Sequence, residues 1–121
     1  MMVLWVSLAG SAGAVARFVL DGMIRSWRAS EFPWATVVIN VTGSLLLGIL
    51  TGLVLFHGMS GSVQAIVGIG FSGGYTTFST ASFETVRLIQ RQNYRAAAAN
   101  AFGQLALTVL AGAAGLAVAG W

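Results

Sequence analysis

The segment Gly68-Ile-Gly-Phe-Ser-Gly-Gly-Tyr-Thr-Thr-Phe-Ser-Thr80 lies inside an apolar stretch of membrane-spanning length and decides the fold of this chain. It contains four glycines and six residues with hydroxyl groups. Glycine weakens a helix, and neighbouring glycines can release backbone carbonyls and amides from helical hydrogen bonding. In a bilayer, released groups are tolerated only where they are buried in protein or face a polar cavity or ion. The segment therefore predicts a helix that is broken within the membrane.

The composition of the chain predicts an integral membrane protein. Of its 121 residues, 57% are hydrophobic and 7% are charged, whereas soluble domains carry about 25% charged residues. At about 20 residues per span, the length fits four helices, expected near residues 3–23, 34–56, 63–90 and 96–121 in a single domain over 1–121. The N-terminus lacks the basic region of a cleaved signal peptide, so we expect it to belong to the fold.

The arginines predict an orientation in the membrane. Arg25 and Arg28 follow the first span, and Arg91 and Arg95 lie between the third and the fourth. With four spans, both connections lie on the same side, and the opposite side carries no lysine or arginine. The positive-inside rule therefore places these connections in the cytoplasm and both termini outside.

The sequence argues against an enzyme. Gly68 to Gly73 matches the G-x-G-x-x-G dinucleotide pattern, but no strand–helix unit surrounds it. The chain has no cysteine, one histidine (His57) and three scattered acids (Asp21, Glu31 and Glu84). No nucleophile–base pair or metal-ligand cluster can be read from these residues.

Neutral polar side chains within the spans leave two interpretations open. Asn100, Gln104 and Thr108 recur every four residues, so they share one helix face. Asn40 lies in the second span, and Ser79 and Thr80 follow the glycines. These side chains are either hydrogen-bonding contacts between helices or a polar track that a small ion follows.

Two ionisable residues, Arg17 and Glu84, lie within or near the spans. Such groups face a bundle interior, a water-filled vestibule or each other. Glu84 and Arg87 are spaced to form an ion pair on one helix face, which is the interpretation we favour over an electropositive mouth that gathers anions.

Together these features resemble the Fluc/CrcB fluoride-channel family over nearly the whole chain. The resemblance is carried by three motifs: Gly13-Ala-Val-Ala-Arg17; Pro33 with Val38-Ile-Asn-Val-Thr-Gly43; and, most specifically, Gly70-Phe-Ser-Gly-Gly-Tyr-Thr-Thr-Phe-Ser-Thr80. It implies an antiparallel dimer with two pores and a structural sodium ion where the two helix breaks meet. The carbonyls of Gly73 and Thr76 would bind that ion.

The resemblance also implies a fluoride path. Phe78 matches the first of two phenylalanines whose ring edges line it, Asn40 and Thr80 match polar lining positions, and Asn100, Gln104 and Thr108 fall on the last-span polar track. Ser79, next to Thr80, is included in the predicted lining. Arg17 and Glu84 would supply charge to the vestibule.

One position departs from the family pattern, because Ala81 stands where the second phenylalanine is expected. A protein that inserts in both orientations (dual topology) should also have a weak charge bias, and this chain has a strong one. The partner is therefore either a second copy or a homologous subunit of opposite bias.

The function implied is a passive fluoride channel in a prokaryotic inner membrane that exports fluoride and gives fluoride resistance. Two alternatives remain. A small four-span drug or cation exporter needs an acid in the first span, where this chain has Arg17 and the late Asp21. A non-conducting partner subunit of a heterodimeric channel is the other.

Overall fold

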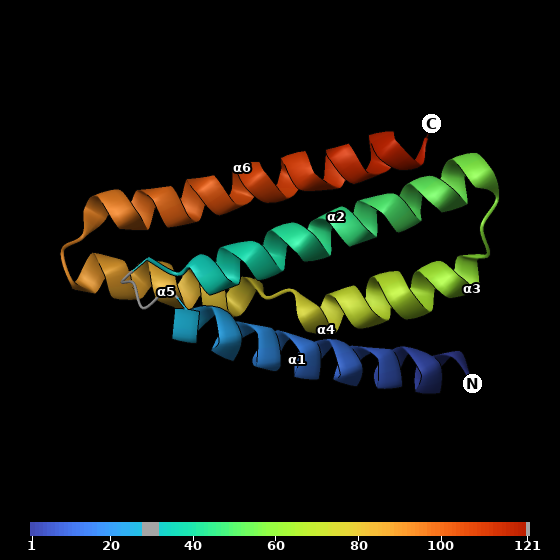
Figure 1. Cartoon of the computed structure of the whole chain (residues 1–121), viewed down its shortest axis with the longest axis horizontal. Coiled ribbons are helices and arrows are strands. Elements are labelled where there is room, and N and C mark those ends of the chain that lie inside the picture. Colours follow the sequence, from blue (N-terminus) through green and yellow to red (C-terminus); the bar gives the residue numbers. More distant parts are fainter. Residues whose placement is uncertain (28–31, 121) are drawn as a thin grey trace.

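A computed structural model describes residues 1–27 and 32–120, so Arg28 and Glu31 lie outside the described residues. Every regular element in the described ranges is helical, as predicted. Within residues 1–27 and 32–120, three helices are long and apolar enough to cross a membrane: α1 (Met2–Trp27), α2 (Trp34–His57) and α6 (Tyr94–Ala119). They run roughly along the long axis of the molecule (Figure 1). The chain is thus a multi-pass membrane protein.

The segment between α2 and α6 is built from four shorter elements. These are α3 (Gly61–Val63), the π-helix η1 (Gln64–Ser72), α4 (Gly73–Tyr75) and α5 (Phe78–Gln90). Between α4 and α5 the backbone is extended, with φ −79° and ψ 157° at Thr76 and φ −146° and ψ 120° at Thr77. The interruption lies within the glycine- and hydroxyl-rich segment.

Local sequence signals account for the helix ends. Pro33 directly precedes α2, and Gly58 ends it in the left-handed conformation (φ 69°) that glycine adopts at little cost. Asn93 begins α6, where its side-chain oxygen accepts a hydrogen bond from the Ala96 N–H at 3.3 Å.

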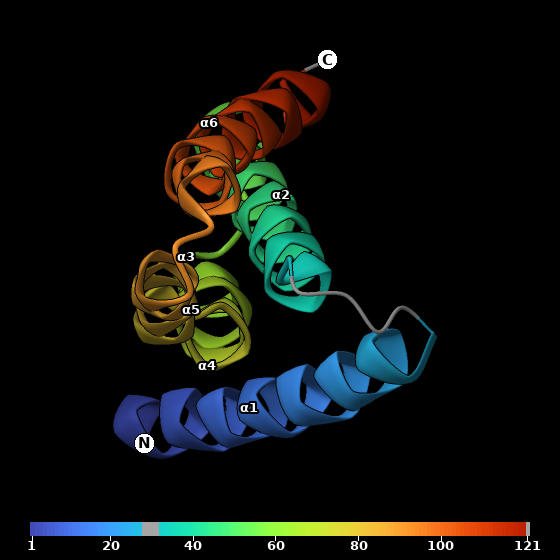
Figure 2. The same cartoon turned by 90° about the vertical axis from the view of Figure 1, so that its left-hand side faces the viewer.

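Small residues bring the helices close together. A Cβ added at Gly48 of α2 would clash with the Gly112 carbonyl of α6, and one at Gly115 would clash with the Leu45 carbonyl. A Cβ at Gly74 would likewise clash with the Gly10 carbonyl of α1. Seen along the long axis, α2 and the segment from α3 to α5 lie between α1 and α6 (Figure 2).

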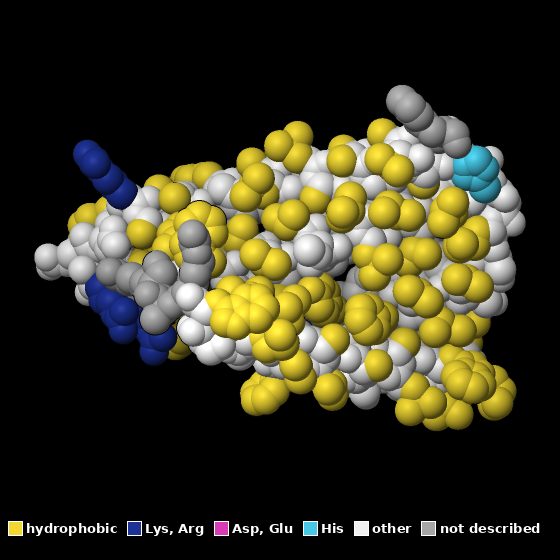
Figure 3. Space-filling model, viewed as in Figure 1, with side chains coloured by type: hydrophobic (Ala, Val, Ile, Leu, Met, Phe, Trp, Pro, Cys, Tyr) yellow, Lys and Arg dark blue, Asp and Glu magenta, His cyan; other side chains and the backbone are white. Residues whose placement is uncertain are grey.

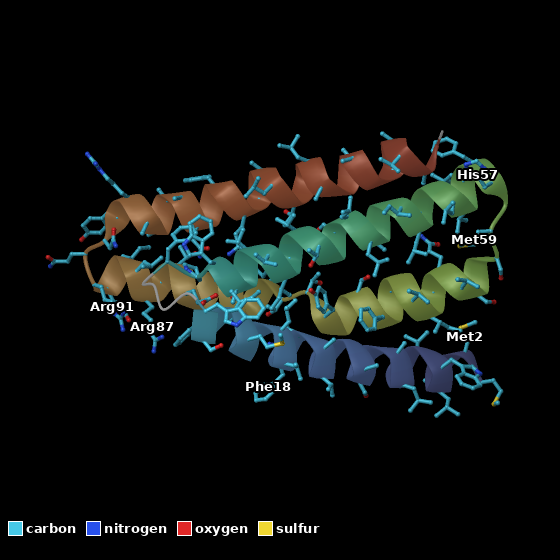
Figure 4. All side chains as sticks on the ribbon, viewed as in Figure 1. Met2, Phe18, His57, Met59, Arg87 and Arg91 are labelled. Carbon is cyan, nitrogen blue, oxygen red and sulfur yellow. The ribbon has the colours of Figure 1, made fainter. Side chains whose placement is uncertain are left out.

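Apolar side chains cover the middle of the outer surface. Phe18 is 77% exposed on α1, and exposed leucines, valines and phenylalanines occur on every long helix. On the face shown in Figure 3 the arginines gather at one end and His57 lies at the other. Arg87 and Arg91 lie at the α5–α6 end, opposite Met2 and Met59 (Figure 4). This distribution suits a protein surrounded by lipid.

Candidate functional site

The interruption between α4 and α5 is held by the buried side chain of Asn40 from α2. The Thr77 N–H donates to Asn40 Oδ1 at 2.8 Å, and Asn40 Nδ2 donates to the Thr77 carbonyl at 3.0 Å. The carboxamide therefore replaces the peptide partners that Thr77 would have in a helix. The Thr77 hydroxyl oxygen then starts α5 by accepting from the Thr80 N–H at 3.1 Å.

The same contact changes the carbonyls at the end of α4. In a continuous helix the Thr77 N–H would donate to the Gly73 carbonyl. Here α4 ends at Tyr75, and the Thr77 N–H donates to Asn40 Oδ1 instead. Thr76 is extended, so its carbonyl also leaves the helical pattern. Gly73 is exposed, with open space where a Cβ would lie. Oxygen donors of this kind are the ligands that hard cations prefer, so the chemistry of Gly73 and Thr76 fits the sodium ion that the family resemblance implies.

Three carboxamides form a hydrogen-bonded chain, which we call the amide relay (Asn40, Gln104 and Asn100). Asn40 Nδ2 donates to Gln104 Oε1 at 2.8 Å, and Gln104 Nε2 donates to Asn100 Oδ1 at 2.6 Å. All three side chains are more than nine-tenths buried, with exposures of 8%, 7% and 1%. The relay joins α2 to α6 and keeps these polar groups paired in an apolar setting.

The relay ends on α5. Asn100 Nδ2 donates to Thr85 Oγ1 at 2.8 Å and to the Ala81 carbonyl at 3.3 Å. Thr85 Oγ1 donates to the same carbonyl at 2.9 Å. Thr108 does not join the relay, because its hydroxyl group donates to the Gln104 carbonyl of its own helix at 2.7 Å.

A groove of about 540 Å³ runs along the relay between α2, α5 and α6. Phe78 projects at its edge and is 87% exposed. The groove is open to the outside of the molecule. Its lining comprises Asn40, Ser44, Thr76, Thr77, Phe78, Ala81, Ser82, Thr85, Val86, Asn100, Ala101, Gln104, Leu105 and Thr108.

The structure brings five of the predicted lining residues together at this groove: Asn40, Phe78, Asn100, Gln104 and Thr108. Thr80 is half-buried and does not line the groove. Its N–H donates to Thr77 Oγ1 in the first turn of α5. The Ser79 side chain lies outside the described part of the chain. Ala81 faces the groove at the departing family position.

Sequence reasoning missed several hydroxyl residues of the groove, including Ser44, Thr77 and Thr85. Ser44 lies one helical turn after Asn40, so the four-residue spacing that revealed the last-span residues could have found it. Thr85 could not have been found in this way, because its role depends on how α5 packs against α6.

A charged network lies at the arginine-rich end. Glu84 is 9% exposed and accepts from Thr36 Oγ1 at 2.6 Å and from Arg25 Nη2 at 3.0 Å. Arg25 Nε also pairs with Asp21 at 2.8 Å. The favoured Glu84–Arg87 pair is therefore wrong.

The reason is local geometry: Arg87 lies over the Phe83 ring, 5.5 Å from its centroid, while Glu84 turns inward to α1 and α2. Arg17 is half-buried on α1 and forms no ion pair with another described residue. A vestibule role for Arg17 and Glu84 stays a prediction.

Membrane-length apolar helices and a polar groove at a helix interruption define a class: a multi-pass membrane protein with hydrogen-bonding side chains grouped in a groove beside that interruption. A family model described as "CrcB-like protein, Camphor Resistance (CrcB)" matches residues 4–116. The chain belongs to this family, as the sequence motifs predict.

Curated relatives cover nearly the whole chain. "Fluoride-specific ion channel FluC 1" of Leifsonia xyli subsp. xyli is 54% identical over 116 residues, covering 96% of this chain and 83% of that protein. "Fluoride-specific ion channel FluC 2" of Cutibacterium acnes is 49% identical over 119 residues, covering 98% and 97%. FluC of Thermus thermophilus is 36% identical over 104 residues, covering 86% and 83%. A channel is a transporter and not an enzyme, which agrees with the expectation from the sequence.

Proposed function

We propose that this chain is a subunit of a fluoride-selective passive channel. The observation that carries the proposal is the groove, where an exposed phenylalanine and a buried row of amides lie together at a helix interruption. Relatives up to 54% identical that are named fluoride-specific ion channels support fluoride as the ion. Family membership favours a channel over the small four-span drug or cation exporter.

The chemistry of the groove suits fluoride. This ion is small and strongly hydrated, so a selective path must replace its water with hydrogen-bond donors at close range. The edge of an aromatic ring carries partial positive charge and can face an anion. In this proposal Phe78, Asn40, Ser79, Thr80, Asn100, Gln104 and Thr108 form or support the wall of the path. Arg17 and Glu84 set the charge at its mouth.

We infer four spans and an antiparallel dimer. The elements from α3 to α5 would together form one discontinuous span, because backbone that leaves a helix at membrane depth has to be buried in protein or face a cavity. A second subunit would close the groove that a single chain leaves open. The same contact would bring two helix interruptions together, and the Gly73 and Thr76 carbonyls would hold a structural sodium ion there.

The direction of flow follows from the membrane potential. In acidic surroundings fluoride enters cells as neutral HF, which dissociates in the less acidic cytoplasm and is trapped there as the anion. A negative potential inside the cell then drives the anion outward through a passive channel in the plasma (inner) membrane. The protein would thereby give fluoride resistance, with the arginine-rich connections in the cytoplasm and both termini outside.

The proposed dimer could pair this chain with a second copy of itself or with a homologous subunit. Ala81 lacks the ring expected of the second family phenylalanine. On the face shown in Figure 3, the arginines lie at one end of the molecule. Both features favour a homologous partner of opposite charge bias, including the case in which this chain conducts poorly without it. A second copy remains the simpler assembly.

Efflux from liposomes tests the proposal. The purified chain, reconstituted alone, should release fluoride much faster than chloride when a fluoride electrode and a chloride electrode are compared. Phe78→Leu should lower the fluoride rate at least about tenfold, the size of effect expected from losing an interaction with a charged ion. Phe102→Leu is the matched control, because Phe102 is also exposed (72%) but does not line the groove.

The first two outcomes distinguish the homodimer from the heterodimer, and the third tests the path along the groove. Robust efflux from the chain alone would count against an obligate partner. Efflux only after co-reconstitution with a homologue would support the heterodimer. Equal loss in both phenylalanine variants would argue against a path along the groove.

A further inference from the structure

Helix α1 spans the interruption between α4 and α5. Before the interruption its backbone lies directly against the chain, because a Cβ added at Gly13 would clash with the Phe71 carbonyl of η1. After the interruption the contact is made by side chains, since Arg25 Nη2 donates to Glu84 Oε2 of α5 at 3.0 Å. The two parts of the interrupted segment are therefore held to α1 in different ways.

Helix α5 packs directly on α6, whereas polar side chains of α1 and α2 reach across to it. At its start, the Asn40 carboxamide holds the backbone of Thr77. About two helical turns further on, Thr36 Oγ1 of α2 donates to Glu84 Oε1 at 2.6 Å, and Arg25 binds the other oxygen. Glu84 is therefore a second point at which α5 is fixed to α1 and α2.

Arg25 allows Glu84 to stay in this place as a carboxylate. Glu84 is 9% exposed, and a buried carboxylate is costly unless it is hydrogen-bonded and paired with a cation. Both of its oxygens accept hydrogen bonds, as expected of the ionised form. Among the described residues its paired cation is Arg25, which Asp21 orients by accepting from Nε at 2.8 Å.

The position of α5 sets the width of the groove. The α5 side of the groove comprises Phe78, Ala81, Ser82, Thr85 and Val86. Glu84 does not line the groove, so its carboxylate holds this side from behind. An α5 helix fixed only at its start and along α6 could tilt away from α2, and the groove would widen.

We propose that Arg25 is a positioning residue for the anion path: its pairing with Glu84 fixes α5 against α1 and α2 and keeps the groove narrow. This inference rests on the proposed channel function. A narrow path makes an ion exchange its water for fixed groups at close range, which favours the ion that those groups fit. Without the pair, the path should distinguish fluoride from chloride less well.

The test variant is Arg25→Gln, and the measurement is the ratio of fluoride to chloride efflux from liposomes. This ratio does not depend on how much of the protein is folded, so a general loss of stability would leave it unchanged. It should fall about three- to tenfold, between the effects of an exposed ion pair and of a hydrogen bond to a charged group.

Arg95→Gln is the matched control. Arg95 is exposed at the same end of the molecule and pairs with none of the described acidic residues. Its substitution removes the same charge and should leave the ratio unchanged. Arg25→Lys keeps a charged donor for Glu84 and should restore most of the ratio. In a Glu84→Gln background, Arg25→Gln should have little further effect.

A spectroscopic measurement separates this inference from the proposed function, because it needs no ion flux. The chain has no cysteine, so Gln90→Cys can carry a single nitroxide label at the exposed end of α5. Electron paramagnetic resonance in liposomes should show a more mobile label when Arg25→Gln is added. Addition of Arg95→Gln should leave the label as it was.

The outcomes are distinct. A fluoride-selective wild type with an unchanged ratio in Arg25→Gln would overturn the inference and leave the channel function standing. Equal falls in Arg25→Gln and Arg95→Gln would also overturn it, because charge alone would then be responsible. If the wild-type chain conducts no fluoride, the label decides: greater mobility in Arg25→Gln alone supports the inference, and unchanged mobility overturns it.

Discussion

At the scale of single residues, Asn40 determines where the helix is interrupted. Its carboxamide pairs with both backbone groups of Thr77 and with Gln104, so one side chain supports the extended backbone and the relay together. A side chain that only lined a path would not need these three contacts. Asn40 therefore has a structural role beside the role proposed for it in the fluoride path.

Asn40→Ala should destabilise the folded chain. The change leaves the part-buried Thr77 N–H and carbonyl and the buried Gln104 Oε1 without these partners, which we expect to cost about 2–4 kcal/mol. Thermal unfolding in detergent measures the loss as a lower melting temperature. Thr108→Val is the control, because the hydrogen bonds of Thr108 to other described residues stay within its own helix. Equal melting temperatures for the two variants would contradict a structural role for Asn40.

The sequence predicted polar residues better than it predicted their partners. Helical spacing identified the face shared by Asn100 and Gln104, and the structure places both in the groove. Their contacts across helices are those expected of the packing interpretation. The Glu84–Arg87 pair failed because helical spacing brings side chains near each other but does not decide whether a third residue, here Arg25, competes.

At the scale of elements, α2 and α6 pack closely because glycines remove the side chains between them. Gly48 lies against Gly112, and Gly115 lies against Leu45 and Ile49. Lipid supplies no hydrophobic force between helices, so this close packing and the Asn40–Gln104 hydrogen bond hold α2 and α6 together. Sequence predicted the long helices near their observed bounds but not the π-helix η1, whose hydrogen-bonding pattern depends on its packing against α1 and α2.

Gly115→Ala should weaken this packing. The added Cβ would clash with the Leu45 carbonyl and approach the Ile49 N at 2.8 Å, and overpacking of this kind costs about 1–3 kcal/mol. Gly103→Ala, on the same helix, meets nothing within 4 Å and should be neutral or stabilising by up to about 1 kcal/mol, because alanine favours helix. Unfolding by SDS titration compares the two. A greater loss in Gly103→Ala would refute this account of the α2–α6 contact.

At the scale of the whole molecule, the two ends differ in charge, because arginines gather at one of them. Arg91 lies in the α5–α6 connection, and Arg95 lies in the first turn of α6. Arg25 lies at the same end and pairs with Glu84 of α5. The opposite end holds the termini, the α2–α3 connection and His57 (Figures 1 and 4). The positive-inside rule predicts a single orientation from this division.

Single cysteines can report this orientation, since the chain has none of its own. In intact cells, a membrane-impermeant maleimide should label Ser62→Cys and spare Gln90→Cys, because both positions are exposed but lie at opposite ends. Permeabilised cells should label both and serve as the control. Partial labelling of both in intact cells would show insertion in two orientations and would favour a homodimer.

The two neighbouring glycines at the start of α4 should differ in how well they tolerate substitution. Gly74 is confined by the Gly10 carbonyl of its own chain, whereas Gly73 faces open space. A scan of all substitutions that scores the amount of folded protein should therefore reject changes at Gly74 and accept alanine at Gly73. A second scan that scores growth in fluoride should reject changes at both, if Gly73 is constrained by what the subunit meets. A difference between the two scans at Gly73 would show a constraint that comes from the assembled channel and not from the fold of the single chain.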